Sequence, residues 1–103
     1  MMNRQAFIQA VKQTIQQIDP QAEVWLFGSQ ARGDARPDSD WDFLMLTDLP
    51  VDRRFKRQVR DQVFYLGMET GETISTTIQN RADWQRLSAT HLYQNIKLEG
   101  KRL

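Results

Sequence analysis

The sequence contains no cysteine, which excludes a disulfide framework and any metal site built from thiolates. It also lacks an apolar run near the ~20 residues that a membrane-spanning helix requires. Its first residues do not form the unbroken apolar core of a signal peptide. These absences predict a soluble protein of the cytoplasm with no membrane partner.

A strong net charge is missing as well. Fourteen Lys and Arg residues face thirteen Asp and Glu residues, which leaves a net charge of +1. A nearly neutral chain has no overall field of the kind that drives non-specific nucleic-acid binding, so nucleic acid is not the expected partner. The length of 103 residues predicts one domain over residues 1–103, with no separate substrate domain. The sequence leaves the oligomeric state open.

The first half of the chain predicts one helix and two strands. Residues 3–18 carry apolar side chains at helical spacing, with Asn3 as the N-cap and Asp19-Pro20 as the stop. Residues 22–27 are short, β-branched and aromatic, which is typical of a buried strand that ends at Gly28. Residues 29–32 suit one helical turn, and residues 41–47 form the second predicted strand.

The second half predicts a helix, a strand and two shorter helices. The helix spans residues 51–66, with Pro50 in its first turn and Gly67 or Gly71 at its end. A β-branched run predicts a strand over residues 72–78, and Asn80 is the expected cap of a short helix. The last helix, from about Thr90, is expected to bury the apolar residues Leu92, Tyr93, Ile96 and Leu98. The predicted fold class is α/β (α+β), with a three- to four-stranded mixed sheet and flanking helices.

The connections predict how the strands pair. The second and third strands are joined by a full helix, which favours parallel pairing. The short link between Phe27 and Trp41 has no crossover helix, so the first two strands are expected to be antiparallel neighbours. That pairing would bring Gly28 and Ser29 beside Asp40 and Asp42 at one edge of the sheet.

These four residues suit phosphate and metal chemistry. A Gly-Ser turn that leads into a helical turn offers unpaired backbone N–H groups and a hydroxyl to an anion. Asp40 and Asp42 lie two residues apart on one strand face, and hard carboxylate oxygens are ligands for Mg²⁺. Each piece alone is more typical of an ordinary turn or a solvated loop. Their combination, with an acid placed in an apolar strand, favours a functional site.

The motif Gly28-Ser29, ten residues, then Asp40-Trp41-Asp42 resembles the signature of the polymerase-β-like nucleotidyltransferases. The chain looks most like their minimal members, the MNT or MntA-type antitoxins that are paired with HEPN-domain toxins. The resemblance implies that Asp40 and Asp42 bind Mg²⁺ and carry catalysis, and that Gly28 and Ser29 hold the phosphates of a nucleoside triphosphate. It also implies transfer of AMP from ATP to a tyrosine of a HEPN-type toxin. Arg32, three residues after Ser29, is a further candidate for phosphate binding.

One departure from the family pattern leaves an alternative open. Many active members place a third carboxylate on the next strand, where this chain has Ser75 between an Ile and two Thr residues. Glu72, at the start of that strand, is the nearest acid. The alternative is a non-catalytic antitoxin or nucleotide-binding module that neutralises its partner by binding.

A cluster of basic residues marks the predicted helix 51–66: Arg53, Arg54, Lys56, Arg57 and Arg60. Such a cluster is usually a solvated face, and otherwise a docking surface for an acidic partner or RNA. His91, the only histidine, is expected at the surface or at a helix cap rather than in catalysis.

Overall fold

The computed structural model describes residues 3–103 and contains five helices and four strands within them. The helices are α1 (Arg4–Ile18), α2 (Ser29–Arg32), α3 (Arg53–Thr70), α4 (Arg81–Arg86) and α5 (His91–Glu99). The strands are β1 (Glu23–Phe27), β2 (Trp41–Thr47), β3 (Ile74–Asn80) and β4 (Lys101–Arg102). They form one mixed sheet in the order β3-β2-β1-β4. The predicted mixed α/β architecture is confirmed.

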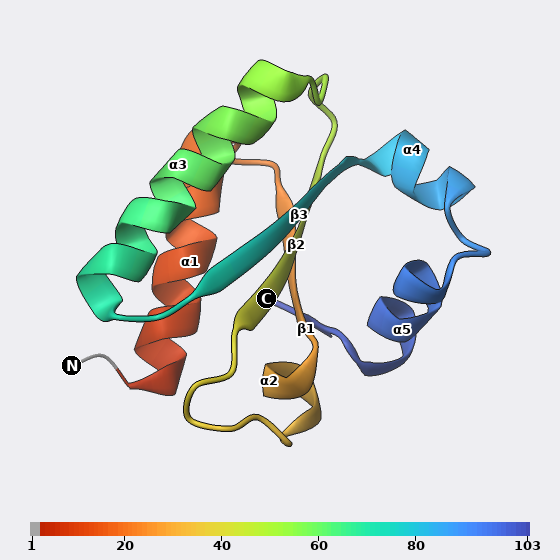
Figure 1. Ribbon diagram of the computed structural model, residues 1–103. Helices are drawn as coiled ribbons and strands as arrows, with labels where there is room; N and C mark the ends of the chain where they lie inside the picture. The colour runs from red at the N-terminus through yellow and green to blue at the C-terminus, as the bar shows by residue number, and fades with distance from the viewer. Residues whose placement is uncertain (1–2) are drawn as a thin grey trace.

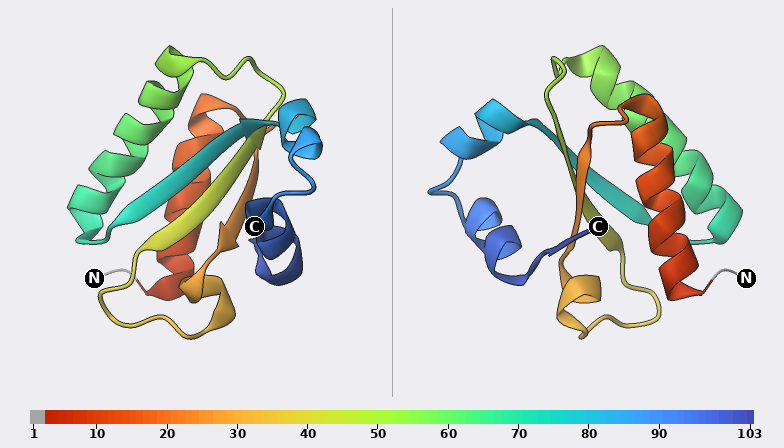
Figure 2. Two further views of the ribbon diagram at one scale, coloured as in Figure 1. Left: turned by 45° about the vertical axis from the view of Figure 1, so that its right-hand side comes forward. Right: turned by 180° about the vertical axis from the view of Figure 1, so that it is seen from behind.

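The sheet separates two layers of helices. Helices α1 and α3 lie side by side against one face, and α4 and α5 lie on the other (Figure 1, Figure 2). Alternate side chains of β2, including Phe43 and Met45, enter the larger core beneath α1 and α3. Leu44 and Leu46 point the other way and form a smaller core with Trp84 and Ile96.

Strand pairing follows the prediction. β1 and β2 are antiparallel, with Phe27 opposite Asp42, while β2 and β3 are parallel, with Asp42 beside Ser75. The Asn3, Asn80 and Thr90 side chains each accept a hydrogen bond from a backbone N–H at the start of a helix. The predicted caps Asn3 and Asn80 are therefore confirmed, because a cap depends on residues only two or three positions apart, and Thr90 is a further cap.

Some boundaries differ from the prediction. Helix α3 begins at Arg53 rather than at residue 51, because the Asp52 side chain accepts a hydrogen bond from Phe55 N at 2.8 Å and caps the helix. Pro50 thus precedes the helix instead of lying in its first turn. Helix α3 continues to Gly71, whose φ of 74° ends it, and β3 begins two residues later than predicted.

The predicted burial of α5 is wrong in two places. Ile96 is buried and Tyr93 is half-buried, but Leu92 is 41% exposed and Leu98 is 88% exposed. Helix α5 contacts the sheet along a narrow line, so only one of its residues enters the core. A short fourth strand, β4, was not specified by the sequence; it follows α5 and pairs antiparallel with β1 at Trp25 and Leu26. No helix within residues 3–103 has the length and apolar character needed to cross a membrane.

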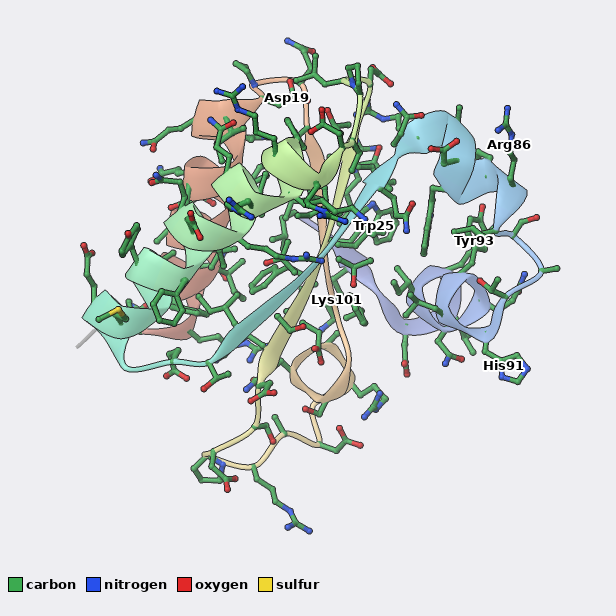
Figure 3. All side chains as sticks on the ribbon, turned by 45° about the horizontal axis from the view of Figure 1, so that its top comes forward. Asp19, Trp25, Arg86, His91, Tyr93 and Lys101 are labelled. Carbon is green, nitrogen blue, oxygen red and sulfur yellow. The ribbon has the colours of Figure 1, made fainter. Side chains whose placement is uncertain are left out.

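Two threonines of the sheet differ in how their hydroxyls are satisfied. The Thr47 hydroxyl donates to Asp19 Oδ2 and accepts from Leu49 N at 3.1 Å. Asp19 lies at the end of α1 (Figure 3) and is itself buried. By contrast, the Thr76 hydroxyl oxygen is buried and has no hydrogen-bond partner within residues 3–103.

We expect opposite effects from the same substitution at these two threonines. Thr47→Val leaves the buried Asp19 carboxylate and the Leu49 N–H without their partner and should lower the free energy of unfolding by about 1–3 kcal/mol. Thr76→Val removes an unsatisfied hydroxyl and should leave stability unchanged or raise it by up to about 1 kcal/mol. Urea denaturation of both variants measures the difference, and equal losses at the two positions would contradict it.

Candidate functional site

The candidate site begins at the turn between β1 and α2. Gly28 has a φ of 75° and a ψ of −160°, a conformation that L-residues other than glycine rarely adopt. A Cβ atom at this position would collide with the carboxylate oxygen Oδ2 of Asp42. The turn therefore lies directly against Asp42, and only glycine leaves room for that contact.

The two aspartates lie at the start of β2. Asp42 is the second residue of the strand and is half-buried, while Asp40 immediately precedes the strand and is exposed. Because Asp42 is opposite Phe27, the antiparallel ladder places it at the end of β1 where the Gly28-Ser29 turn begins. The structure thus brings Gly28, Ser29, Asp40 and Asp42 together at one edge of the sheet.

Burial and charge act on the Asp42 carboxyl. Its pKa is raised above the ordinary 3.8, first by desolvation and second by the negative charge of Asp40. Arg32 opposes this rise through its positive charge. The ionised form of Asp42 is therefore costly in this environment, and a bound cation would relieve that cost.

Arg32 lies at the end of α2, but it faces acids of the protein. Its guanidinium is paired with Asp34 Oδ2 at 3.3 Å and with Glu99 Oε1 at 3.2 Å. Hydrogen bonds to these two carboxylates raise the pKa of Arg32. The pair with Glu99 joins α2 to the end of α5, so binding of a phosphate by Arg32 would compete with this contact.

The position beside Asp42 on β3 carries a hydroxyl instead of an acid. Ser75 is the residue next to Asp42 in the parallel ladder, and it is exposed. Glu72 does not replace the acid, because its carboxylate accepts a hydrogen bond from Trp41 Nε1 at 3.1 Å. Within residues 3–103 no group of three or more His, Cys, Asp or Glu side chains is placed to hold a metal ion. Two carboxylates are what the protein offers at this edge.

Two polar residues near the site were missed by the sequence analysis. Arg4 donates from Nη1 to Gln30 Oε1 at 3.0 Å and from Nη2 to the Gln30 carbonyl at 2.6 Å. The same guanidinium lies 5.2 Å from the centroid of the Trp41 ring. Arg4 thereby joins the residue after Ser29 to the residue between the two aspartates. No local pattern could reveal this, because Arg4 and Gln30 are 26 positions apart.

The family model for the nucleotidyltransferase domain matches residues 8–97, which include the turn and both aspartates. The chain belongs to this family. A search of curated protein sequences returns no match.

Solved structures show the same fold. A chain of a toxin–antitoxin complex with AMP-PNP superposes with a TM-score of 0.69 at 19% identity, over 91% of this chain and 69% of that one. The complex of an MNT antitoxin with a tri-AMPylated HEPN toxin of Shewanella oneidensis matches with a TM-score of 0.67 at 17% identity. The match covers 97% of this chain and 71% of that one. A double aspartate-to-glutamate mutant of the toxin–antitoxin pair MntA-HpeT matches with a TM-score of 0.68 at 17% identity. The match covers 91% of this chain and 69% of that one. This nucleotidyltransferase domain is thus similar in fold to antitoxin-complex chains.

The raised pKa of Asp42 predicts that this residue lowers the stability of the free protein. Because the folded-state pKa is raised, the folded protein favours the protonated carboxyl over the ionised one. The protein is therefore most stable, as far as Asp42 is concerned, below the unfolded-state pKa, and it loses stability as the pH rises through the folded-state pKa. Asp42→Asn should therefore raise the melting temperature at pH 7, by about 2–5 °C for a domain of this size. The gain should shrink as the pH approaches 3.8, the ordinary value of the carboxyl. Calorimetry across this pH range tests the prediction, with Asp38→Asn in the loop before β2 as the control. A gain that did not depend on pH would contradict the electrostatic cause.

Proposed function

We propose that residues 1–103 form one nucleotidyltransferase domain that moves a nucleoside monophosphate, AMP in the favoured case, from a nucleoside triphosphate to a hydroxyl of a partner protein. The observation that carries this proposal is the contact between the turn and the acid. Gly28 lies so close to Asp42 that a Cβ would collide with its carboxylate. A phosphate at the turn would therefore be next to the metal-binding acids, as nucleotidyl transfer requires.

The residues at this edge fit a divalent cation. Asp40 and Asp42 supply hard oxygen ligands. Desolvation, and second the charge of Asp40, raise the pKa of Asp42, and a bound cation would offset both costs of its ionised form. Magnesium bound there would withdraw charge from the phosphate oxygens and stabilise the leaving pyrophosphate. Asp40 and Asp42 are the residues we propose for metal binding and catalysis.

The remaining roles follow from position. Gly28 would allow the triphosphate to approach the backbone. Ser29 would offer its hydroxyl, and the start of α2 would offer backbone N–H groups. Arg32 is the proposed cation for the phosphates, released from Glu99 or Asp34 when nucleotide binds. In the transfer, the acceptor oxygen forms a bond to the α-phosphorus and the bond to the bridging oxygen breaks. Pyrophosphate leaves, and the acceptor's proton passes to solvent.

We propose a HEPN-type toxin as the partner, with this domain as its cytoplasmic antitoxin. Support comes from the chains of similar fold, because one occurs with a tri-AMPylated HEPN toxin and another in a toxin–antitoxin complex with AMP-PNP. The proposed acceptor is a hydroxyl of that toxin. ATP is the proposed donor and Mg²⁺ the proposed metal.

A second function is favoured by one observation, the serine beside Asp42. β3 carries no third acid in the described residues. No further carboxylate is therefore placed there to bind a second metal ion or to act as a general base. The domain would then bind its partner, with or without nucleotide, and neutralise it without a reaction.

The test is incubation of the purified domain with labelled ATP, Mg²⁺ and the protein of the adjacent gene. Proposed transfer predicts label on the partner, pyrophosphate release in equal amount and loss of both with EDTA. A partner that is neutralised without label would establish the binding function instead. In a parallel measurement, Mg²⁺ with a non-hydrolysable ATP analogue should raise the melting temperature, because the ligand binds only the native state.

A further inference from the structure

A long groove runs along helix α3 and, over part of its length, beside strand β3. Three adjoining hollows of about 520, 430 and 310 Å³ follow the helix from Val51 to Gly71. The first two share Arg60 and Asp61, and the second and third share Val63, Phe64 and Ile74. One continuous surface therefore extends along most of α3, and residues of β3 line its second and third hollows.

The helix side of the groove changes character along its length. Lys56, Arg60, Phe64 and Met68 recur every four residues, so they form one stripe on α3. Phe64 is 62% exposed and Met68 is 67% exposed, which is unusual for large apolar side chains unless another molecule covers them. The groove is thus basic at the start of α3 and apolar at its end.

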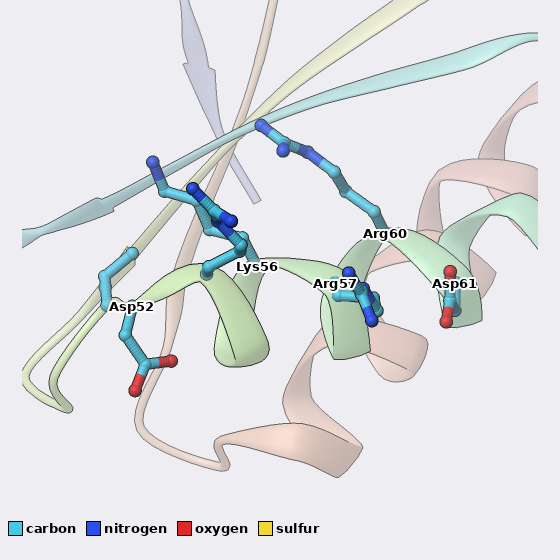
Figure 4. Close-up of a pocket in the computed structure, with 7 residues that line it drawn as sticks. Asp52, Lys56, Arg57, Arg60 and Asp61 are labelled. Atoms are coloured by element: carbon cyan, nitrogen blue, oxygen red, sulfur yellow. The ribbon is translucent and has the colours of Figure 1, made fainter.

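The basic half carries charge that the protein does not neutralise. Arg53, Lys56, Arg57 and Arg60 line it, and Figure 4 shows Lys56 and Arg60 directed from the helix toward the strands. None of the four makes an ion pair with a side chain in residues 3–103, although other arginines, such as Arg32 and Arg81, do. Asp52, which lies at one end of this half, is used as the cap of α3. Asp61 lines this half as well, so the four cations outnumber the two acids and the half is net positive. That excess of positive charge suits an acidic ligand.

The strand side of the groove is an open sheet edge. Within residues 3–103, β3 is the outermost strand and pairs only with β2. The Thr73 carbonyl accepts from Trp41 N at 2.9 Å, and alternate residues of a parallel strand direct their backbone groups to the same neighbour. Ser75 and Thr77 therefore face β2, while the backbone groups of Ile74, Thr76 and Ile78 face outward. These unpaired groups repeat at the spacing of a peptide backbone.

We propose that this groove binds an extended segment of the partner protein, which adds to β3 as a further strand. Acidic residues of the segment lie against Lys56 and Arg60, and apolar residues lie against Phe64 and Met68. Edge-strand pairing supplies affinity through the backbone, and the two-part stripe selects the sequence. The inference rests on the proposed function only in that the segment belongs to the same partner.

The composition of the groove favours a protein segment over nucleic acid. A nucleic-acid strand carries phosphate at every nucleotide and would need cations along the whole groove, whereas the half around Phe64, Met68 and Ile74 has none in its lining. An unpaired strand edge also has no complement in a phosphate backbone. A peptide that is acidic at one end and apolar at the other matches both halves.

Matched variants on α3 separate the groove from the rest of the helix. Arg60→Glu and Phe64→Ser change the stripe, while Arg54→Glu and Tyr65→Ser change exposed neighbours outside the lining; Tyr65 is 58% exposed. The partner of the adjacent gene is titrated in calorimetry without ATP. We expect at least about tenfold weaker binding for the first two variants and less than about twofold change for the controls. Equal effects of groove and control variants overturn the proposal, as does a wild-type domain that does not bind the partner.

Strand addition has its own readout in amide hydrogen exchange followed by NMR. In the complex, the outward N–H groups of Thr76 and Ile78 should exchange at least about tenfold more slowly than in the free domain. The Ser75 N–H, which faces β2, should be protected in both. Unchanged exchange at Thr76 and Ile78 overturns strand pairing. Protection of the same amides in a dimer of the domain alone, seen by sedimentation, overturns the choice of occupant.

The two proposals fail separately in these experiments. A partner that binds through the groove but receives no label removes the transfer reaction and leaves the docking surface. A partner that is labelled equally by the wild type and by Arg60→Glu and Phe64→Ser, with unchanged affinity, leaves the reaction and removes the docking surface.

Discussion

Asp42→Asn is expected to lower nucleotidyl transfer to the partner by at least about 10³-fold, equivalent to about 4 kcal/mol of transition-state stabilisation. The substitution keeps the shape of the side chain and removes its charge. Asp42 lies against the Gly28-Ser29 turn, which is the proposed phosphate site, so its carboxylate is the acid that we expect to act together with that turn. Loss of that charge removes the proposed cation site rather than the fold.

The control for this variant is Asp38→Asn, which makes the same change in net charge at an exposed residue of the loop before β2. It should transfer label at the wild-type rate. Because Asp42→Asn is also expected to melt at a higher temperature than the wild type, unfolding cannot explain its loss of activity. Transfer within about tenfold of wild type would remove Asp42 from the catalytic role. Protection from the toxin that survives the variant would favour neutralisation by binding.

Gly28→Ala is the second large effect that we expect. The added Cβ collides with the Asp42 carboxylate, and the alanine must also adopt the φ of 75° that Gly28 has. The turn or the strand therefore has to move. We expect a loss of about 2–4 kcal/mol in unfolding free energy. The melting temperature should no longer respond to Mg²⁺ with an ATP analogue, because the site that the turn and Asp42 form together is displaced.

Gly71→Ala is a closely matched control for the backbone term. Gly71 has a φ of 74°, but a Cβ there has no atom within 4 Å. It should cost only about 1–2 kcal/mol and leave the response to nucleotide intact. In the background Asp42→Ala, which removes the colliding oxygen, Gly28→Ala should cost about as much as Gly71→Ala. Equal costs of Gly28→Ala with and without Asp42 would show that the collision is unimportant.

Local patterns were sufficient for the helix caps, the strands and the proximity of Gly28 to Asp42. The link of thirteen residues between β1 and β2 contains no full crossover helix, so antiparallel pairing was expected from the connection, and the structure has it. Where two local signals competed, the prediction was wrong: Pro50 suggested an earlier start for α3, but the Asp52 cap determined it.

Contacts between segments far apart in the chain could not be predicted from the sequence patterns. Nothing in the pattern of α5 distinguished Ile96, which enters the core, from Leu98, which does not. The orientation of α5 depends on the sheet surface that it meets. The contacts of Arg4 with Gln30 and Trp41, and of Arg32 with Glu99, join residues 26 or more positions apart. Such contacts exist only after the layers have packed.

The sequence by itself determined the family of this protein and the residues of its candidate site, because the motif of turn and acids is contiguous and its geometry follows from one strand pairing. Tertiary structure decided what surrounds that motif. It placed Ser75 beside Asp42, directed Glu72 to Trp41, and left the edge of β3 open next to the stripe on α3. The physical reason is that strand register and helix packing act between segments far apart in the chain, and they decide which neighbours each side chain has.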